Sequence, residues 1–123
     1  NPDFAQEFAL LQKGLENYRQ IQAAIVGYLG QGKIDMIGLY ATRILHATGK
    51  IYCGKVLLDM ALVAQKKINE LGTDHYDYAF YQGKVAAARF FLQNIVPEVE
   101  TTLAIIKAGD TSVLELEEKA FLI

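Results

Sequence analysis

The sequence predicts an all-α fold, an up-down-up bundle of three long helices plus a short C-terminal helix, similar in outline to a four-helix bundle. Apolar residues recur at alternating steps of three and four over long stretches, which is the period of an amphipathic helix. Only two prolines interrupt the 123 residues. Hydrophobic residues make up 52% and charged residues 21%, which is typical of a globular chain. We therefore expect a single domain, 1–123, with its own core.

The first helix is predicted over 3–29. Asn1-Pro2-Asp3 suits a helix start, with a capping side chain, a proline in the first turn and an acid near the positive end of the dipole. The segment 27–33 reads G-x-x-x-x-G-K, one residue short of a phosphate-binding loop. Position 34 is Ile where Ser or Thr would hold magnesium, and the preceding segment is helical where a strand is required. We interpret 27–33 as a helix end and turn.

The second helix is predicted over 35–71, capped by Asp35 and followed by Gly72. Gly49 and Gly54 would let a neighbouring helix approach closely. From 56 to 64 the helix is apolar on nearly every side, so we expect more than one neighbour to cover it.

The third helix is predicted to open at Thr73-Asp74 and to run to 107. Pro97 removes a backbone hydrogen bond and should bend it. Gly109 stops it, and the capping-box pattern from Ser112 predicts a short final helix. Its apolar stripe consists of Tyr78, Tyr81, Val85, Ala88, Leu92, Ile95, Val99, Leu103 and Ile106.

Charge and composition exclude several classes of function. The formal net charge is −2, without the basic excess that a nucleic-acid partner requires. No apolar run approaches the ~20 residues that cross a bilayer, and we expect no signal peptide. The single cysteine, Cys53, excludes an internal disulfide and suits a reducing, cytoplasmic compartment. Because the chain starts at Asn1 rather than Met, we expect a piece of a larger protein.

We predict no catalytic, cofactor-binding or metal-ligating residue in this chain. His46 and His75 stand alone, and Cys53 has no second thiol. The single serine, Ser112, lies in a capping position, which argues against a hydrolytic triad. No G-x-G-x-x-G follows a strand.

The candidate functional residues are partner contacts. Lys55 and Asp59, one turn apart, either form an ion pair on the helix flank or meet a partner. Lys84 and Arg89 either extend over apolar surface or contact an acidic partner. The aromatic cluster around Tyr81 fits a core, an interface or a flat ligand. The predicted contacts are thus Tyr81, Lys84, Arg89, Lys55 and Asp59.

Several motifs resemble the C-terminal extension of large acyl-CoA dehydrogenase-like flavoenzymes. The likeness is firm over 76–121, looser over 35–71, and limited to helical character over 1–30. It also includes the small residues Gly49, Cys53 and Gly54 before the apolar run. The residues that carry it most firmly are Tyr81-x-x-Lys84-x-x-x-Ala88-Arg89-Phe90-Phe91, Pro97-Glu98, Gly109, Ser112 and Phe121.

The resemblance implies a parent oxidoreductase that removes two hydrogens from the α and β carbons of an acyl-CoA and passes them to FAD. The flavin, the acyl-CoA pocket and the catalytic carboxylate would belong to preceding core domains, and no glutamate here matches that carboxylate. This piece would pack against the core or a second subunit. Some large relatives use this region at membranes, but the chain lacks a strongly basic amphipathic face.

Two alternatives stay open. One is an independent helical protein-interaction module without an enzymatic role. The other is a ligand-binding bundle, which predicts an enclosed cavity beside Tyr78 and Tyr81.

Overall fold

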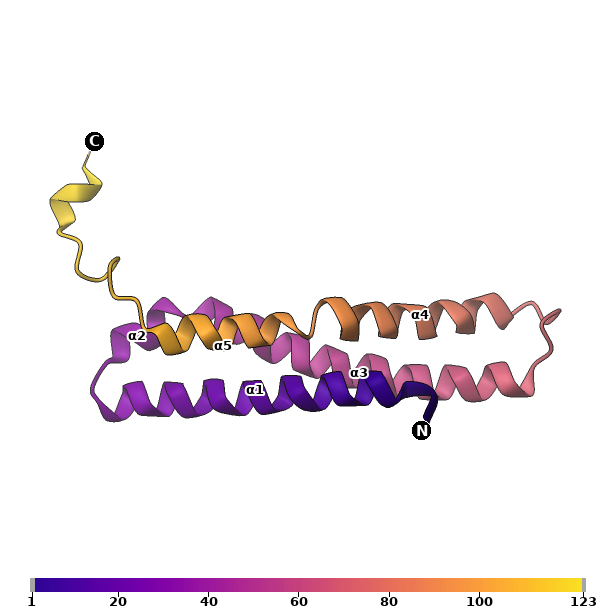
Figure 1. Ribbon diagram of the computed structural model, residues 1–123. Helices are drawn as coiled ribbons and strands as arrows, with labels where there is room; N and C mark the ends of the chain where they lie inside the picture. Colours follow the sequence, from indigo (N-terminus) through magenta and orange to yellow (C-terminus); the bar gives the residue numbers. More distant parts are fainter. Residues whose placement is uncertain (1, 123) are drawn as a thin grey trace.

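The computed structural model describes residues 2–122, which form three antiparallel helical rods and a projecting C-terminal arm (Figure 1). The order runs up, down and up, and the described residues contain helices without strands, which confirms the predicted all-α class. The first rod is α1 (Ala5–Gly30), preceded by a 3-10 turn (Pro2–Phe4); the second is α2 (Ile34–Leu39) with α3 (Ala41–Glu70); the third is α4 (Tyr78–Asn94) with α5 (Glu98–Ala108); the arm carries a 3-10 turn (Glu118–Phe121).

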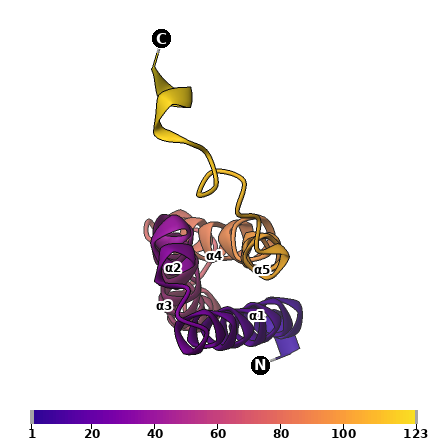
Figure 2. The same cartoon turned by 90° about the vertical axis from the view of Figure 1, so that its left-hand side faces the viewer.

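Seen end-on, the rods lie at the corners of a triangle (Figure 2). The principal helix pairs are α3 with α4, α1 with α5, and α1 with α3. The core has two halves along the bundle. The first half contains Phe4, Leu58, Ala61, Ala64, Val85, Ala88, Leu92 and Val96, and the second half contains Ile21, Met36, Tyr40, Ala47, Val99, Leu103 and Ile106.

The stripe predicted over 78–106 faces this core. Six of its nine residues are buried, and the other three are half-buried.

The third rod breaks completely before Pro97, where the sequence predicts a bend. The backbone N–H groups of Ile95 and Val96 both donate to the Phe91 carbonyl, at 2.8 and 3.1 Å. Because proline cannot continue the helical ladder, residues 95–97 form a turn. This turn places Val96 fully inside the core.

Glycines make room for Val96. A Cβ added at Gly54 would lie 3.0 Å from Val96 Cγ2, so the predicted close approach is confirmed there. The same prediction is wrong for Gly49, whose added Cβ would meet nothing within 4 Å. The tightest position is Gly14 on α1, where an added Cβ would lie 2.7 Å from Val96 Cγ1.

The prediction of one continuous helix over 35–71 is wrong at Tyr40, which separates α2 from α3. Its backbone leaves the helical range, with φ −100° and ψ 7°. The reason is tertiary: the Tyr40 ring is buried, and its hydroxyl donates to the Asp110 carbonyl at 3.4 Å. Asp35 is not the cap, because Lys33 holds that position and Asp35 lies in the first turn of α2.

Two further helix boundaries differ from the prediction. The third rod begins at Tyr78 rather than at Thr73-Asp74, because residues 72–77 form turns. The helix predicted from Ser112 is wrong: the Asp110 carboxylate accepts the Ser112 backbone N–H at 3.1 Å and its hydroxyl at 2.8 Å. These bonds stabilise a turn instead of a helix.

Three other sequence features have mixed outcomes. Gly109 ends α5 in the left-handed conformation, with φ 64°, as predicted. Segment 27–33 is the end of α1 and a turn with Gly32 at φ 71°, which confirms that interpretation. The predicted capping role of Asn1 lies outside the described residues.

Candidate interaction surface

The outward side of α3 carries a stripe of exposed apolar side chains. Tyr52 is 69% exposed, Val63 60%, Met60 40% and Val56 38%. The prediction that 56–64 is covered therefore holds for the buried residues Leu58, Ala61 and Ala64 and in part for the half-buried Leu57 and Leu62, but not for the α3 residues exposed on the outward side. We call Tyr52, Val56, Met60 and Val63 the α3 stripe.

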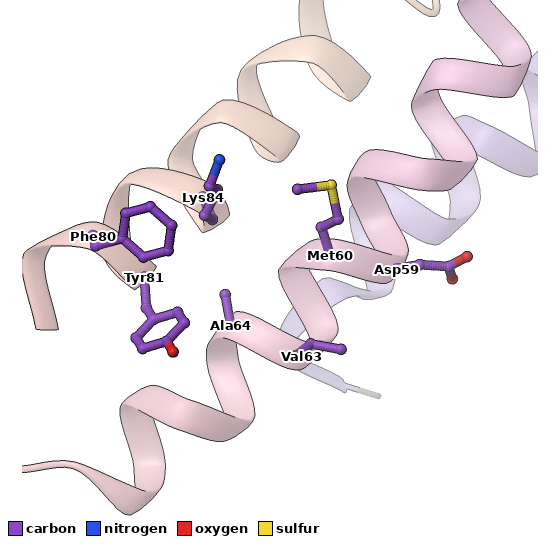
Figure 3. Close-up of a pocket in the computed structure, with 7 residues that line it drawn as sticks. All are labelled: Asp59, Met60, Val63, Ala64, Phe80, Tyr81 and Lys84. Carbon is purple, nitrogen blue, oxygen red and sulfur yellow. The ribbon is translucent and has the colours of Figure 1, made fainter. Parts of the chain in front are cut away.

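An apolar groove lies on the α4 side of the stripe (Figure 3). Its volume is about 360 Å³. Phe80, Tyr81 and Lys84 project from α4 toward Met60 and Ala64 of α3 (Figure 3). Lys84 Nζ lies 5.1 Å from the centre of the Phe80 ring, a cation–π contact. The full lining is Asp59, Met60, Val63, Ala64, Phe80, Tyr81 and Lys84.

A second apolar groove lies on the α1 side of the stripe and has a volume of about 460 Å³. Phe8 and Leu15 of α1, which the helical pattern places inward, are partly exposed along it. Lys55 and Asp59 stand at its rim, and Asp59 also borders the first groove. The two grooves therefore flank α3 and share Asp59. The lining consists of Phe8, Leu11, Leu15, Tyr18, Thr48, Ile51, Tyr52, Lys55, Leu58 and Asp59.

Lys55 and Asp59 form the predicted ion pair, with Nζ 2.9 Å from Oδ2. The hydrogen bond and the charge of Asp59 raise the pKa of the Lys55 ammonium. Both side chains are largely exposed, so the pair neutralises two charges on the surface without bracing two helices.

Arg89 holds the start of α1 against α4. Its Nε lies 3.1 Å from Glu7 Oε1, and Nη2 donates to the Asp3 carbonyl at 3.1 Å. The guanidinium carbon lies 4.9 Å from the centre of the Phe4 ring. The buried Nε makes no hydrogen bond of good geometry, so its contact with Glu7 is a charge contact.

The burial of Glu7 is a feature that the sequence analysis misses. Its charge suggests the polar side of α1, yet its spacing of seven and fourteen residues from Gly14 and Ile21 turns it inward, and its side chain is only 6% exposed. No local signal reveals the partner, because Arg89 is far along the chain on another helix. A role of Arg89 at an external partner stays a prediction, and its guanidinium already makes the internal contacts described above.

The α1–α5 side of the bundle is closed by polar contacts. Lys13 pairs with Glu100, with Nζ 3.3 Å from Oε2, and Lys107 Nζ donates to Gln20 Oε1 at 2.9 Å. The Tyr28 hydroxyl donates to the Ile106 carbonyl across the same seam. The α1-side groove contains an uncharged cross-helix contact, in which the Tyr18 and Thr48 hydroxyls lie 2.7 Å apart.

The described part of the chain, residues 2–122, contains no group of three or more His, Cys, Asp or Glu side chains that could hold a metal ion. None of its helices combines the length and apolarity needed to cross a membrane. The ligand-binding hypothesis predicts an enclosed cavity beside Tyr78 and Tyr81, and the hollow beside Tyr81 is an open groove instead.

Comparison with known proteins identifies the family. The model of the family described as "Acetyl-CoA dehydrogenase C-terminal like" matches residues 1–117. The chain belongs to this family. The match confirms the resemblance, extends it over 1–30, and stops short of Phe121.

Three relatives show how much of a longer protein this family domain represents. Two proteins named butyryl-CoA dehydrogenase from Syntrophomonas wolfei subsp. wolfei are 43% and 39% identical, over 99% and 98% of this chain. The "Broad-specificity linear acyl-CoA dehydrogenase FadE5" of Mycobacterium tuberculosis is 35% identical over 94% of it. Each alignment covers 20% of the relative. The chain thus spans about a fifth of the length of the curated relatives it matches.

Proposed function

We propose that this chain is the non-catalytic C-terminal accessory domain of an FAD-dependent acyl-CoA dehydrogenase. One observation carries the proposal: almost the whole chain aligns with proteins named acyl-CoA dehydrogenases, yet covers only 20% of each. The parent enzyme would oxidise a linear acyl-CoA between its α and β carbons, with FAD as acceptor. The domain packs against the catalytic core or a second subunit and stabilises the assembly.

The residues of this domain do not fit a flavin dinucleotide. The two grooves beside α3 are lined almost entirely by apolar side chains, and Lys55 at the rim of one is already paired with Asp59. Lys84 is the one further cation among the lining residues, and these residues include no glycine-rich loop that could bind phosphate. We therefore assign FAD, the acyl-CoA pocket and the catalytic carboxylate to the parent's other domains.

Expression of two polypeptides tests this proposal. The 123-residue chain alone should fold as a helical bundle without flavin absorbance. The longer natural polypeptide that contains it should carry FAD and oxidise butyryl-CoA with an artificial electron acceptor. Flavin that co-purifies stoichiometrically with the short chain would overturn the proposal.

An independent helical interaction module is the second candidate, and the exposed α3 stripe favours it. A native gene that encodes only these residues, with its own start codon, would select this alternative. For either function we propose a cytoplasmic location, because the single cysteine, Cys53, is exposed and unpaired.

A further inference from the structure

We propose that the α3 stripe and its two grooves are the surface on which the dehydrogenase core of the same polypeptide docks. This inference rests on the proposed function and adds to it the interface and its occupant. Four of the five predicted partner contacts line this surface: Tyr81, Lys84, Lys55 and Asp59.

The first argument is the mismatch between the apolar character of α3 and its coverage. A helical run that is apolar on nearly every side, as 56–64 is, is stable in water only when neighbours cover those sides. Inside the bundle α1 and α4 cover the inward face of α3, while Met60, Val63 and Phe80 stay exposed beside one groove. Contiguous exposed apolar surface of this kind marks an interaction site.

The second argument is the placement of charge. The described ion pairs that join different helices, such as Lys13 with Glu100, lie on other sides of the bundle. The cross-helix contact in the α1-side groove is uncharged: the Tyr18 and Thr48 hydroxyls lie 2.7 Å apart. At the α3 surface the charges are the exposed Lys55–Asp59 pair and Lys84, which makes no ion pair with a described carboxylate. An apolar centre with few charges at its edge is the composition of a protein interface. We expect the occupant to be apolar and to place a carboxylate near Lys84.

The third argument identifies the occupant. About four-fifths of each relative's length lies outside the aligned part. A covalently tethered neighbour binds intramolecularly, at an effective concentration that reaches the millimolar range for short flexible linkers. Phe4, in the first turn, belongs to the same core cluster as Leu58, Ala61 and Ala64 of α3. A polypeptide that precedes residue 2 thus joins the bundle at the half that holds the α4-side groove (Figure 1). A second copy has neither advantage.

Cysteine reactivity tests the docking surface. With Cys53→Ser as background, Val63→Cys places a thiol on the α3 stripe, and Ala104→Cys places a matched thiol on the exposed side of α5. Each is made in the 123-residue chain and in the full-length polypeptide. We expect a maleimide to label Val63→Cys roughly tenfold or more slowly in the full-length protein than in the short chain. Ala104→Cys should react equally in both.

A charge reversal sharpens the test. Lys84→Glu in the full-length protein should restore much of the reactivity of Val63→Cys, because the docked carboxylate would then be repelled. Circular dichroism of the same variant in the short chain should show an unchanged helical fold, since Lys84 makes no ion pair inside the bundle.

Each other outcome overturns the proposal. Equal labelling of Val63→Cys in both polypeptides means that nothing covers the stripe. If the labelling rate of Val63→Cys in the short chain falls as the protein concentration rises, a second copy is the occupant. Protection that needs added phosphatidylglycerol vesicles identifies a lipid surface. The readout does not depend on flavin or turnover, so a full-length protein without dehydrogenase activity refutes the proposed function separately.

Discussion

Replacing Gly14 by alanine tests the close packing around Val96. The new Cβ would lie 2.7 Å from Val96 Cγ1 and 3.0 Å from Ile51 Cδ1. Val96 is fully buried, with Gly54 of α3 on its other side, so its methyl groups have little room to retreat. The turn before Pro97 also constrains its backbone. Something in this part of the core must shift.

Two opposing effects determine how Gly14→Ala changes the free energy of unfolding. Alanine in place of glycine inside a helix stabilises it by about 1 kcal/mol. Forcing an extra methyl group into a well-packed core costs about 1–3 kcal/mol. We therefore expect Gly14→Ala to change the free energy of unfolding by between ~0 and ~2 kcal/mol in the destabilising direction. Gly49→Ala is the matched control, because its Cβ meets nothing within 4 Å, and it should stabilise by about 0.5–1 kcal/mol.

Urea unfolding of the 123-residue chain, followed by circular dichroism, measures both free energies. A double-mutant cycle with Val96→Ala then isolates the contact. Removing the Val96 methyl groups relieves the crowding, so Val96→Ala should cost less in the Gly14→Ala background, by about 1 kcal/mol. Equal stabilisation by Gly14→Ala and Gly49→Ala would refute the close approach of α1 to the turn before Pro97.

Three further predictions concern charge and exposure. Arg89→Leu should destabilise the short chain by about 1–2 kcal/mol in urea unfolding, because it leaves the Glu7 carboxylate buried without its cation, a cost reduced by the partial exposure of Arg89; adding Glu7→Gln should recover part of the loss, and no recovery would contradict the pairing. Hydrogen bonds from Ser112 hold the pKa of the Asp110 carboxyl below its ordinary value, so its small contribution to stability is present above the ordinary pKa and is lost as pH falls through the lowered one. Ser112→Ala should raise the pKa of that carboxyl in an NMR titration, and an unmoved pKa would exclude a role for the hydroxyl. Val63→Asp should change the stability of the short chain by no more than about 0.5 kcal/mol, because its side chain is exposed there; a loss of several times that size would mean that the stripe is already covered.

Periodicity predicts the inward faces because burial and helical phase are linked at every turn. The stripe from Val85 to Ile106 follows this rule, with Val85, Leu92, Val99 and Ile106 all buried. The interruption at Pro97 was also predictable, since proline lacks the N–H that a continuous helix needs. The depth of Val96 was not, because the break shifts the phase of the helix at that residue.

The features that escaped prediction depend on contacts between distant segments. Tyr40 ends α2 because its ring enters the core and its hydroxyl meets the Asp110 carbonyl. Glu7 is buried because Arg89 reaches it from α4. Of the predicted contacts, the Lys55–Asp59 pair is the one whose partner was foreseen, because it is a local i,i+4 arrangement of opposite charges.

The apolar run 56–64 separates two kinds of disagreement between pattern and structure. At Tyr40 the sequence pattern predicts a continuous helix, but burial of the ring and the hydrogen bond to the Asp110 carbonyl interrupt it. At Met60 and Val63 the pattern predicts buried side chains, but α1 and α4 leave both exposed. When the rest of a sequence is consistent with its fold, apolar residues that the fold leaves exposed indicate a partner outside it. The chain spans a fifth of the length of its relatives, and we propose that the missing neighbour is the rest of a longer polypeptide. Protection of a thiol at position 63 is therefore the decisive measurement.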